Sequence, residues 1–183
     1  MPITIHQGYL PSAIGRIAAL HAQIYHRQAG FGVAFEAKVA RELADFCEHY
    51  DSARDGLWLA LQDGQVEGSI AIHGPGVDTG SGISGGPVPH AAHLRWFITS
   101  ERTRGSGIGS ALLNAALGFC RVQRYPCVYL WTFEGLHAAR YLYEKAGFRL
   151  THQARGTQWG TEVNEQRFEL HTAPNPATSH PPA

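Results

Sequence analysis

The chain has 183 residues, which is enough for one domain with a hydrophobic core. Basic and acidic residues number 15 each and the formal net charge is zero, so neither a nucleic-acid-binding face nor a basic membrane-binding run is expected. The N-terminus lacks the pattern of a signal peptide, no apolar stretch approaches the roughly 20 residues of a membrane span, and the three cysteines form no C-x-x-C motif. The sequence therefore predicts a cytoplasmic protein with reduced thiols.

Hydrophobic periodicity predicts alternating helices and strands along the chain. The turn Asp63-Gly64 lies between two apolar runs, which is typical of a tight β-hairpin. Ser12 precedes a helical pattern as its candidate N-cap, and Gly147 ends another. The predicted strands lie at residues 3–8, 57–61, 66–72, 94–98, 128–133, 149–154 and 162–171, and the predicted helices at about 12–27, 34–49, 111–124 and 136–147.

Residues 1–171 are predicted to form a single domain of the α/β or α+β class, because helical and strand patterns alternate without a linker. Residues 74–89 are rich in Gly, Pro and Ser and predict a long loop that is too short to join two domains. Residues 172–183 are rich in proline and predict a disordered tail.

The segment 93–111 carries the strongest functional signal. An apolar run ends in a polar turn, which is followed by the basic, glycine-rich hinge 104–109 and an apolar helix. This order exposes backbone N–H groups at the positive end of a helix, which predicts an anion site, most naturally for phosphate.

The spacing of the glycines excludes two common phosphate loops. No lysine follows Gly109, as a P-loop requires, and glycines at 105, 107 and 109 do not fit G-x-G-x-x-G. The remaining pattern is Arg-x-x-Gly-x-Gly, met by Arg104, Gly107 and Gly109. A glycine-rich turn without a ligand is the alternative for this segment.

The Arg-x-x-Gly-x-Gly pattern resembles the acetyl-CoA pyrophosphate loop of the GNAT superfamily of N-acyltransferases. The second signature of that superfamily, A-x-x-L-Y-E-K-x-G-F, follows in the expected order and is met by Ala139, Leu142, Tyr143, Glu144, Lys145, Gly147 and Phe148. The resemblance covers residues 50–170, and the stretch 130–148 is most similar to the GNAT half of bacterial MarR–GNAT fusion proteins.

The resemblance implies a mixed, mostly antiparallel sheet with helices on both faces and splayed central strands. It further implies an acetyl-CoA-dependent N-acetyltransferase that moves an acetyl group to a primary amine of a small molecule or peptide, by direct attack on the thioester. A non-catalytic acyl-CoA sensor of the same fold is the alternative. The expected partners are an amine and, as an open expectation, a second copy of the chain; no metal, nucleic acid or membrane is expected.

The resemblance also assigns residues to acetyl-CoA. The pyrophosphate would bind the N–H groups of residues 104–109, and the pantetheine arm would pair with residues 97–99 as an added strand. The predicted cofactor-binding residues are Phe97, Ile98, Thr99, Arg104, Gly105, Ser106, Gly107, Ile108, Gly109 and Ser110. Family members carry an Asn near position 136, where this chain has Leu136.

Tyr143 matches the general acid of the family, and an ordinary tyrosine pKa of about 10 keeps its hydroxyl protonated at neutral pH. A core aromatic is the alternative reading of Tyr143. The base is less defined: His93 is the candidate, a satisfied strand histidine is the alternative, and Glu134 and His137 are rivals.

The predicted acceptor pocket lies between the first two helices and the last two strands. Aromatic residues are more often core than pocket, and those that could line it are Tyr25, Phe31, Phe35, Trp131, Phe133 and Trp159. Trp159 is the best candidate, because in the loop 156–160 a large apolar side chain has less core to join. His90 and His93 could approach one metal ion, but they lack a third ligand, so no metal site is predicted.

Overall fold

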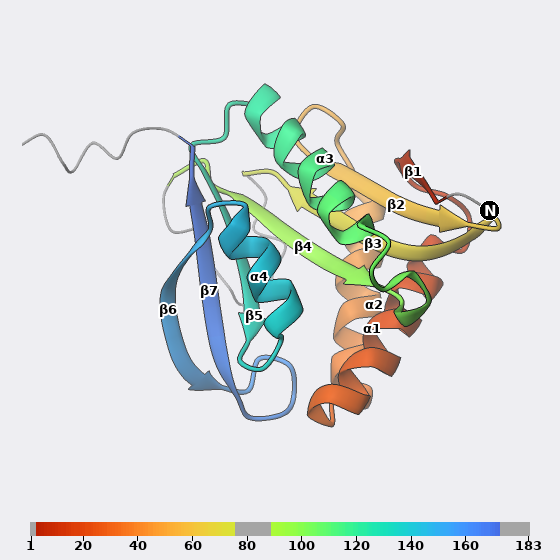
Figure 1. Ribbon diagram of the computed structural model, residues 1–183, viewed down its shortest axis with the longest axis vertical. Helices are drawn as coiled ribbons and strands as arrows, with labels where there is room; N and C mark the ends of the chain where they lie inside the picture. Colours follow the sequence, from red (N-terminus) through yellow and green to blue (C-terminus); the bar gives the residue numbers. More distant parts are fainter. Residues whose placement is uncertain (1–2, 76–88, 173–183) are drawn as a thin grey trace, which may run out of the picture.

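The computed structural model describes residues 3–75 and 89–172, and its elements follow the predicted order (Figure 1). They are β1 (Thr4–Gln7), α1 (Ala13–Ala29), α2 (Val33–Glu48), β2 (Gly56–Gln62), β3 (Gln65–His73), β4 (Ala92–Thr99), η1 (Glu101–Thr103), α3 (Ile108–Val122), β5 (Cys127–Phe133), α4 (His137–Lys145), β6 (Arg149–Gly156) and β7 (Val163–His171). Most of the predicted 74–89 loop and nearly all of the predicted 172–183 tail lie outside the described residues.

The strands form one seven-stranded sheet in the order β1-β2-β3-β4-β5-β7-β6. All neighbouring strands are antiparallel except β4 and β5, which are parallel and pair only at Ala92–Val128 and His93–Tyr129. Beyond these two positions β4 and β5 diverge, which opens the sheet between them (Figure 1). The predicted mixed sheet with splayed central strands is confirmed.

Helices cover both faces of the sheet, α1 and α2 on one and α3 and α4 on the other (Figure 1). Strand alternation separates the two cores because successive side chains point to opposite faces. Leu57 and Leu59 of β2 pack with Phe35 and Leu43 of α2, whereas the intervening Trp58 belongs to the core under α3. The predicted α/β class with two helical layers is therefore confirmed.

Left-handed backbone conformations explain where several elements end. Asp63 (φ 52°) and Gly64 (φ 74°) form the tight turn of the β2–β3 hairpin, as predicted. Gly147 (φ 97°) follows the end of α4, also as predicted. Ser12 occupies the N-cap position of α1, but its φ is 72° and its side chain makes no capping hydrogen bond, so its predicted role as a cap is wrong.

A β-bulge interrupts β4 beside the opening. Ser69 of β3 pairs with Ile98 and Ala71 pairs with Arg95, so three residue steps on β4 face two on β3. Trp96 lies in the bulge with φ 46°, and its carbonyl oxygen accepts a hydrogen bond of 2.7 Å from the Ser69 hydroxyl. As a result Arg95 and Trp96 both lie on the α1/α2 side, while Phe97 packs toward the α3/α4 core.

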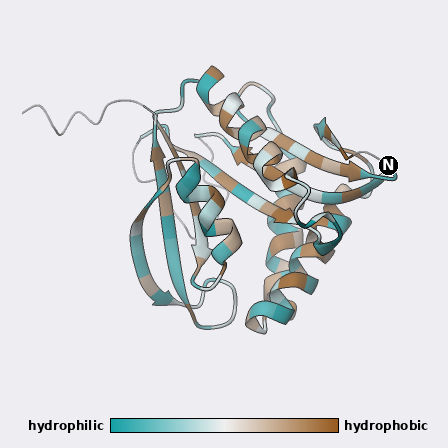
Figure 2. Ribbon diagram, in the orientation of Figure 1, coloured by the Kyte–Doolittle hydropathy of each residue, from teal (hydrophilic) through white to brown (hydrophobic). Residues whose placement is uncertain are grey.

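Hydropathy differs between the two halves of the sheet (Figure 2). Strand β2 is mainly apolar, and both β2 and β3 are buried over most of their length, whereas β6 is exposed over most of its length and carries mainly polar side chains. None of the helices in the described ranges is both long and apolar enough to cross a membrane.

Candidate functional site

A groove of about 800 Å³ runs between the end of β4, the loop before α3 and the start of α4. Among the residues that line it are nine of the ten predicted cofactor-binding residues: Phe97, Ile98, Thr99, Arg104, Gly105, Gly107, Ile108, Gly109 and Ser110. The tenth, Ser106, is not part of the lining, and its hydroxyl donates a hydrogen bond of 2.6 Å to the Thr103 carbonyl oxygen within the turn.

The N-terminus of α3 supplies donors to this groove. The first intrahelical bond runs from the Ala111 N–H to the Gly107 carbonyl oxygen at 3.1 Å, so the N–H groups that precede Ala111 at the start of the helix have no partner in it. The N–H groups of Arg104 and Ser106 already donate to carbonyl oxygens of the η1 turn. Within 104–109 the N–H groups of Arg104 and Ser106 are therefore occupied, and those of residues 107–110 are the candidate donors at the helix end; the anion site itself stays a prediction.

The two loop glycines serve different purposes. Gly107 has φ 79°, the left-handed region that side-chain-bearing residues rarely adopt. A Cβ added at Gly109 would lie 3.0 Å from Leu142 Cδ1 and 3.7 Å from Phe97 Cζ, so only glycine leaves this wall of the groove open. Such a cradle fits a diphosphate approached closely by backbone.

Leu136 lies at the N-cap position of α4 and lines the same groove. Its side chain cannot accept a hydrogen bond, and α4 has no side-chain cap. The start of α4 therefore offers the groove an apolar surface where a polar amide was expected from the resemblance.

A second, smaller cavity of about 120 Å³ lies between α1, α2, β4, β5 and the β6–β7 loop. All six aromatic residues predicted for the acceptor pocket line it: Tyr25, Phe31, Phe35, Trp131, Phe133 and Trp159. The far wall is formed by β5 and the β6–β7 loop and not by β6 and β7 themselves. Tyr25 and Phe97 line both cavities, so the groove and the acceptor cavity adjoin at the splay of β4 and β5.

Several of these aromatics are also core residues. Phe31 is 2% exposed and packs against Phe35 and Phe133 at centroid distances of 4.9 and 5.1 Å. Trp159 stacks on Phe31 at 6.1 Å and anchors the β6–β7 loop over the cavity. The same aromatic side chains therefore both pack in the core and line the cavity.

Tyr143 of α4 lines the acceptor cavity and is 5% exposed. Its ring packs against Phe97, Phe148 and Phe168 at centroid distances of 5.9 to 6.0 Å. Burial raises the pKa of the Tyr143 hydroxyl well above its usual value, so it remains protonated at neutral pH. Within the described ranges no residue accepts a hydrogen bond from it. The role of Tyr143 as general acid stays a prediction.

His93 lies at the last position at which β4 pairs with β5, and it also lines the cavity. Its ring stacks on Tyr129 at 4.4 Å and 9°. Burial, followed by the charges of Arg95 and His73, lowers the pKa of His93 well below its usual value, so the ring is neutral at pH 7. A neutral imidazole can accept a proton, and the role of base stays a prediction.

The two rivals for the base lie elsewhere. Glu134 is exposed, accepts a hydrogen bond of 3.0 Å from Asn164 Nδ2 and does not line the acceptor cavity. His137 begins α4 and lines the groove. The structure thus separates both residues from the acceptor cavity.

His21 of α1 is a cavity residue that the sequence analysis missed. It is 5% exposed, and burial lowers its pKa to about 4. Its Nδ1 lies 2.9 Å from the Ile17 carbonyl oxygen, which can only accept, so Nδ1 carries the proton and Nε2 holds a lone pair. A histidine on the apolar face of the predicted 12–27 helix was the available signal.

Three charged residues of the cavity were also missed. Glu42 of α2 binds both Lys38, at 2.6 Å, and Arg95 of β4, through a short ion pair. The Arg95 guanidinium lies 4.2 Å above the Trp96 ring and its side chain is 13% exposed. A charged residue inside the apolar run 94–98 was the signal that could have found this cluster.

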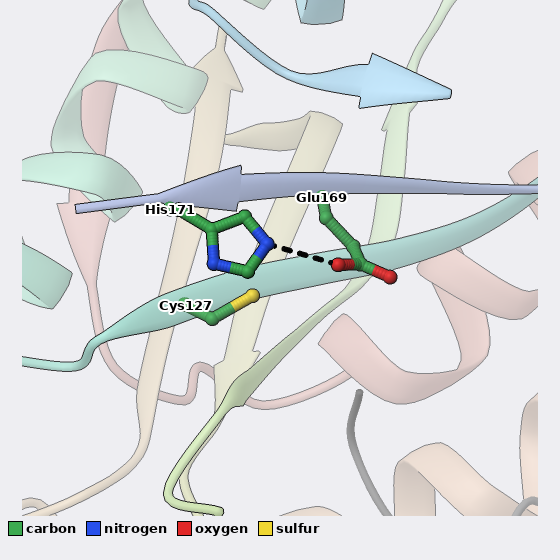
Figure 3. A group of neighbouring side chains, drawn as sticks. All are labelled: Cys127, Glu169 and His171. Atoms are coloured by element: carbon green, nitrogen blue, oxygen red, sulfur yellow. Dashed lines mark hydrogen bonds and ion pairs between the residues drawn. The ribbon is translucent and has the colours of Figure 1, made fainter. Parts of the chain in front are cut away.

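A separate polar network lies where β5 begins. Cys127, Glu169 and His171 bring potential metal-ligand atoms within 4.8 Å of one another (Figure 3). Both Glu169 oxygens already have partners, Thr151 and Arg167 on Oε1 and His171 on Oε2. At this end of β5 and β7, Glu169 therefore links neighbouring side chains through hydrogen bonds and ion pairs, and the adjacent Arg167 guanidinium opposes a bound cation.

Comparisons with known proteins agree with this geometry. The model of the Acetyltransferase (GNAT) family matches residues 20–148. N-acetyltransferase family 8 member 2 of Rattus norvegicus is 34% identical over 60% of this chain and 46% of its own length, and human N-acetylaspartate synthetase is 29% identical over 72% and 40%. The chain therefore spans less than half the length of these relatives.

Solved structures agree in fold. yncA from Salmonella typhimurium, solved with its cofactor acetyl-CoA, has a TM-score of 0.69 at 15% identity over 96% of this chain and 99% of that one. A ribosomal-protein-alanine N-acetyltransferase from Brucella melitensis has a TM-score of 0.67 at 15% identity over 93% and 99%.

Proposed function

The chain belongs to the acetyltransferase (GNAT) family, and from this premise we propose that it is an acetyl-CoA-dependent N-acetyltransferase acting on a primary amine of a small molecule or peptide. Its relatives include N-acetyltransferases, one of them named for N-acetylaspartate, an acetylated amino acid. We also propose a cytoplasmic location, which accords with three cysteines that are all free thiols.

The observation that carries the proposal is the junction of the two cavities. The groove presents backbone donors of residues 107–110 to a diphosphate, and the smaller cavity adjoins it at Tyr25 and Phe97. A thioester laid along the groove would reach the splay, where β4 has no β5 partner beyond His93. An amine in the smaller cavity would approach it from the α1/α2 side.

The reaction needs few groups. Acetyl-CoA supplies a thioester, and the amine nitrogen forms a C–N bond at its carbonyl carbon as the C–S bond breaks. Tyr143 donates its proton to the leaving thiolate, and the surplus proton of the amine passes to a neutral imidazole or to water. Unpaired main-chain groups of β4 face the gap, where a developing oxyanion can be stabilised.

Amine-dependent release of the CoA thiol tests the proposal. We expect acetyl-CoA to bind in calorimetry and thiol to be released only when a suitable amine from a broad panel is present. Tight binding without release for any amine would overturn the enzyme and favour the acyl-CoA sensor.

A further inference from the structure

The charge of the acceptor cavity is unexpected for an enzyme that binds amines. Among its described lining residues, those charged at neutral pH are Lys38, Arg95 and Glu42, because burial keeps His21 and His93 neutral. Two cations share one carboxylate, so the lining carries a net positive charge. A simple ammonium ion or a polyamine would be repelled by this charge.

Arg95 has donors left over for a ligand. A guanidinium carries five N–H groups in a fixed fork. Glu42 is the one acceptor that Arg95 binds within the described residues, and the same carboxylate also binds Lys38 at 2.6 Å. The guanidinium carbon lies 4.2 Å from the centroid of the Trp96 ring, a contact that helps to hold the side chain in place. It is therefore a positioned, partly paired cation on the cavity wall.

A second buried donor lies on the strand across the splay. The indole N–H of Trp131 in β5 is shielded from solvent and has no hydrogen-bond partner among the described residues. Trp131 lines the same cavity as Arg95. An unsatisfied buried donor costs free energy, and an acceptor group on a ligand would remove that cost.

We propose that the acceptor amine also carries a carboxylate, and that Arg95 is the residue that recognises it. The inference rests on the proposed N-acetyltransferase function and names its substrate class as amino acids and related amino-carboxylates. A zwitterion resolves the charge conflict: its carboxylate pairs with Arg95, while its nitrogen lies toward the splay. The positive wall also favours the neutral form of the amine, which is the nucleophile.

The test compares each acid with its own amide. Aspartate, phenylalanine and 4-aminobutyrate, and the corresponding amides, are assayed for amine-dependent CoA release. We expect at least one acid to exceed its amide in kcat/KM by roughly 10- to 100-fold, the range of a charge-assisted hydrogen bond. In an α-amino acid amide the amino group is less basic than in the free acid and is more often neutral. Amine protonation alone would therefore give the amide the higher kcat/KM.

Variants assign the preference to Arg95. Arg95→Gln should abolish the acid-over-amide ratio by raising KM for the acid, while Arg95→Lys should retain part of it. Arg155→Gln removes an arginine from a surface Arg–Glu pair and should leave the ratio unchanged. Glu42→Gln frees Arg95 from its competitor and should lower KM for the acid, which gives a reading even where Arg95→Gln does not fold.

The outcomes are distinct. Equal turnover of acids and amides, or a preference that survives Arg95→Gln and is unmoved by Glu42→Gln, overturns the carboxylate subsite and leaves the acetyltransferase intact. Thiol release by none of these compounds nor by any simple amine, despite acetyl-CoA binding, overturns the acetyltransferase and the subsite with it.

Discussion

The groove and the acceptor cavity adjoin, yet they are built from different parts of the chain. The groove presents main-chain N–H groups and glycines from segment 97–110, flanked by the start of α4 and the end of α1. The cavity presents aromatic and charged side chains from α1, α2, α4, β4, β5 and the β6–β7 loop. Recognition by backbone tolerates many side chains, whereas recognition by side chains depends on each one.

This contrast predicts how the two regions respond to mutation. Removal of one functional group should be felt most in the acceptor cavity, where no neighbour duplicates it. In the groove several N–H groups would share the proposed anion, so only changes that block the backbone should matter strongly.

The largest effect is expected for Tyr143→Phe. Loss of the general acid should lower kcat by about 100-fold or more with little change in KM. Phenylalanine retains the ring contacts with Phe97 and Phe148, so the fold should persist. Tyr9→Phe, at a 54% exposed position that lines neither cavity, is the control. Near-normal kcat in steady-state assays of the Tyr143 variant would remove the acid role.

Lowering the pH should decrease the free energy of unfolding, because the buried His21 must remain neutral in the folded protein. The folded pKa of about 4 lies below the unfolded value of 6.5, so stability is complete above pH 6.5 and falls as the pH drops toward 4. The loss attributable to His21 is about 3 kcal/mol of unfolding free energy. Urea denaturation of the wild type and of His21→Gln from pH 7.5 to 4.5 measures it.

The glutamine variant keeps a donor for the Ile17 carbonyl oxygen and should show a flatter pH profile. Part of the slope should remain, because the pKa values of His93 and His73 are lowered in the same direction. Parallel profiles for the two proteins would show that His21 is not the source.

A smaller effect is expected for Gly109→Ala. The added Cβ would lie 3.0 Å from Leu142 Cδ1 and would narrow the groove, so the Kd for acetyl-CoA should rise about tenfold, equivalent to about 1.4 kcal/mol. Gly118→Ala in the same helix has open space, with its nearest neighbour at 3.9 Å, and should leave Kd unchanged. Calorimetry that gives equal Kd values for the two variants would contradict the loop assignment.

The smallest effect is expected for Arg104→Gln. Arg104 is exposed, so its attraction for phosphate is screened, and Kd should rise only about threefold at moderate salt. The difference should shrink as the salt concentration rises. Arg121→Gln, an exposed change in the last turn of α3, serves as the control. A loss as large as that for Gly109→Ala would show that charge outweighs backbone shape in this groove.

The same contrast explains what the sequence could predict. The groove follows from local spacing, because Arg104, Gly107 and Gly109 act through a turn whose conformation they determine. The order of helices and strands also follows from local sequence, because each element shows its own hydrophobic periodicity. Even here the free donors shift to 107–110, since the η1 turn uses the N–H groups of Arg104 and Ser106.

The acceptor cavity is harder to predict from the sequence, because its residues are far apart in the chain and come together only in the folded protein. Tyr25 could be named as an aromatic near the expected pocket, but nothing local distinguishes it from a core residue, whereas Trp159 is set apart only by its glycine-flanked loop. His21 and Glu42 lie on different helices and Arg95 on a strand, and no spacing rule connects them. Their relation depends on the packing of α1 and α2 on the sheet.

The bulge at Trp96 has a consequence for transferring knowledge between relatives. Before the bulge the odd-numbered Arg95 lies on the α1/α2 side of the sheet, and after it the even-numbered Ile98 does. If a sequence alignment places a gap here one residue off, side chains of the α1/α2 face are matched with side chains of the α3/α4 face. Residues of β4 in different relatives should therefore be matched by aligning the bulge first, and not by counting positions from either end of the strand.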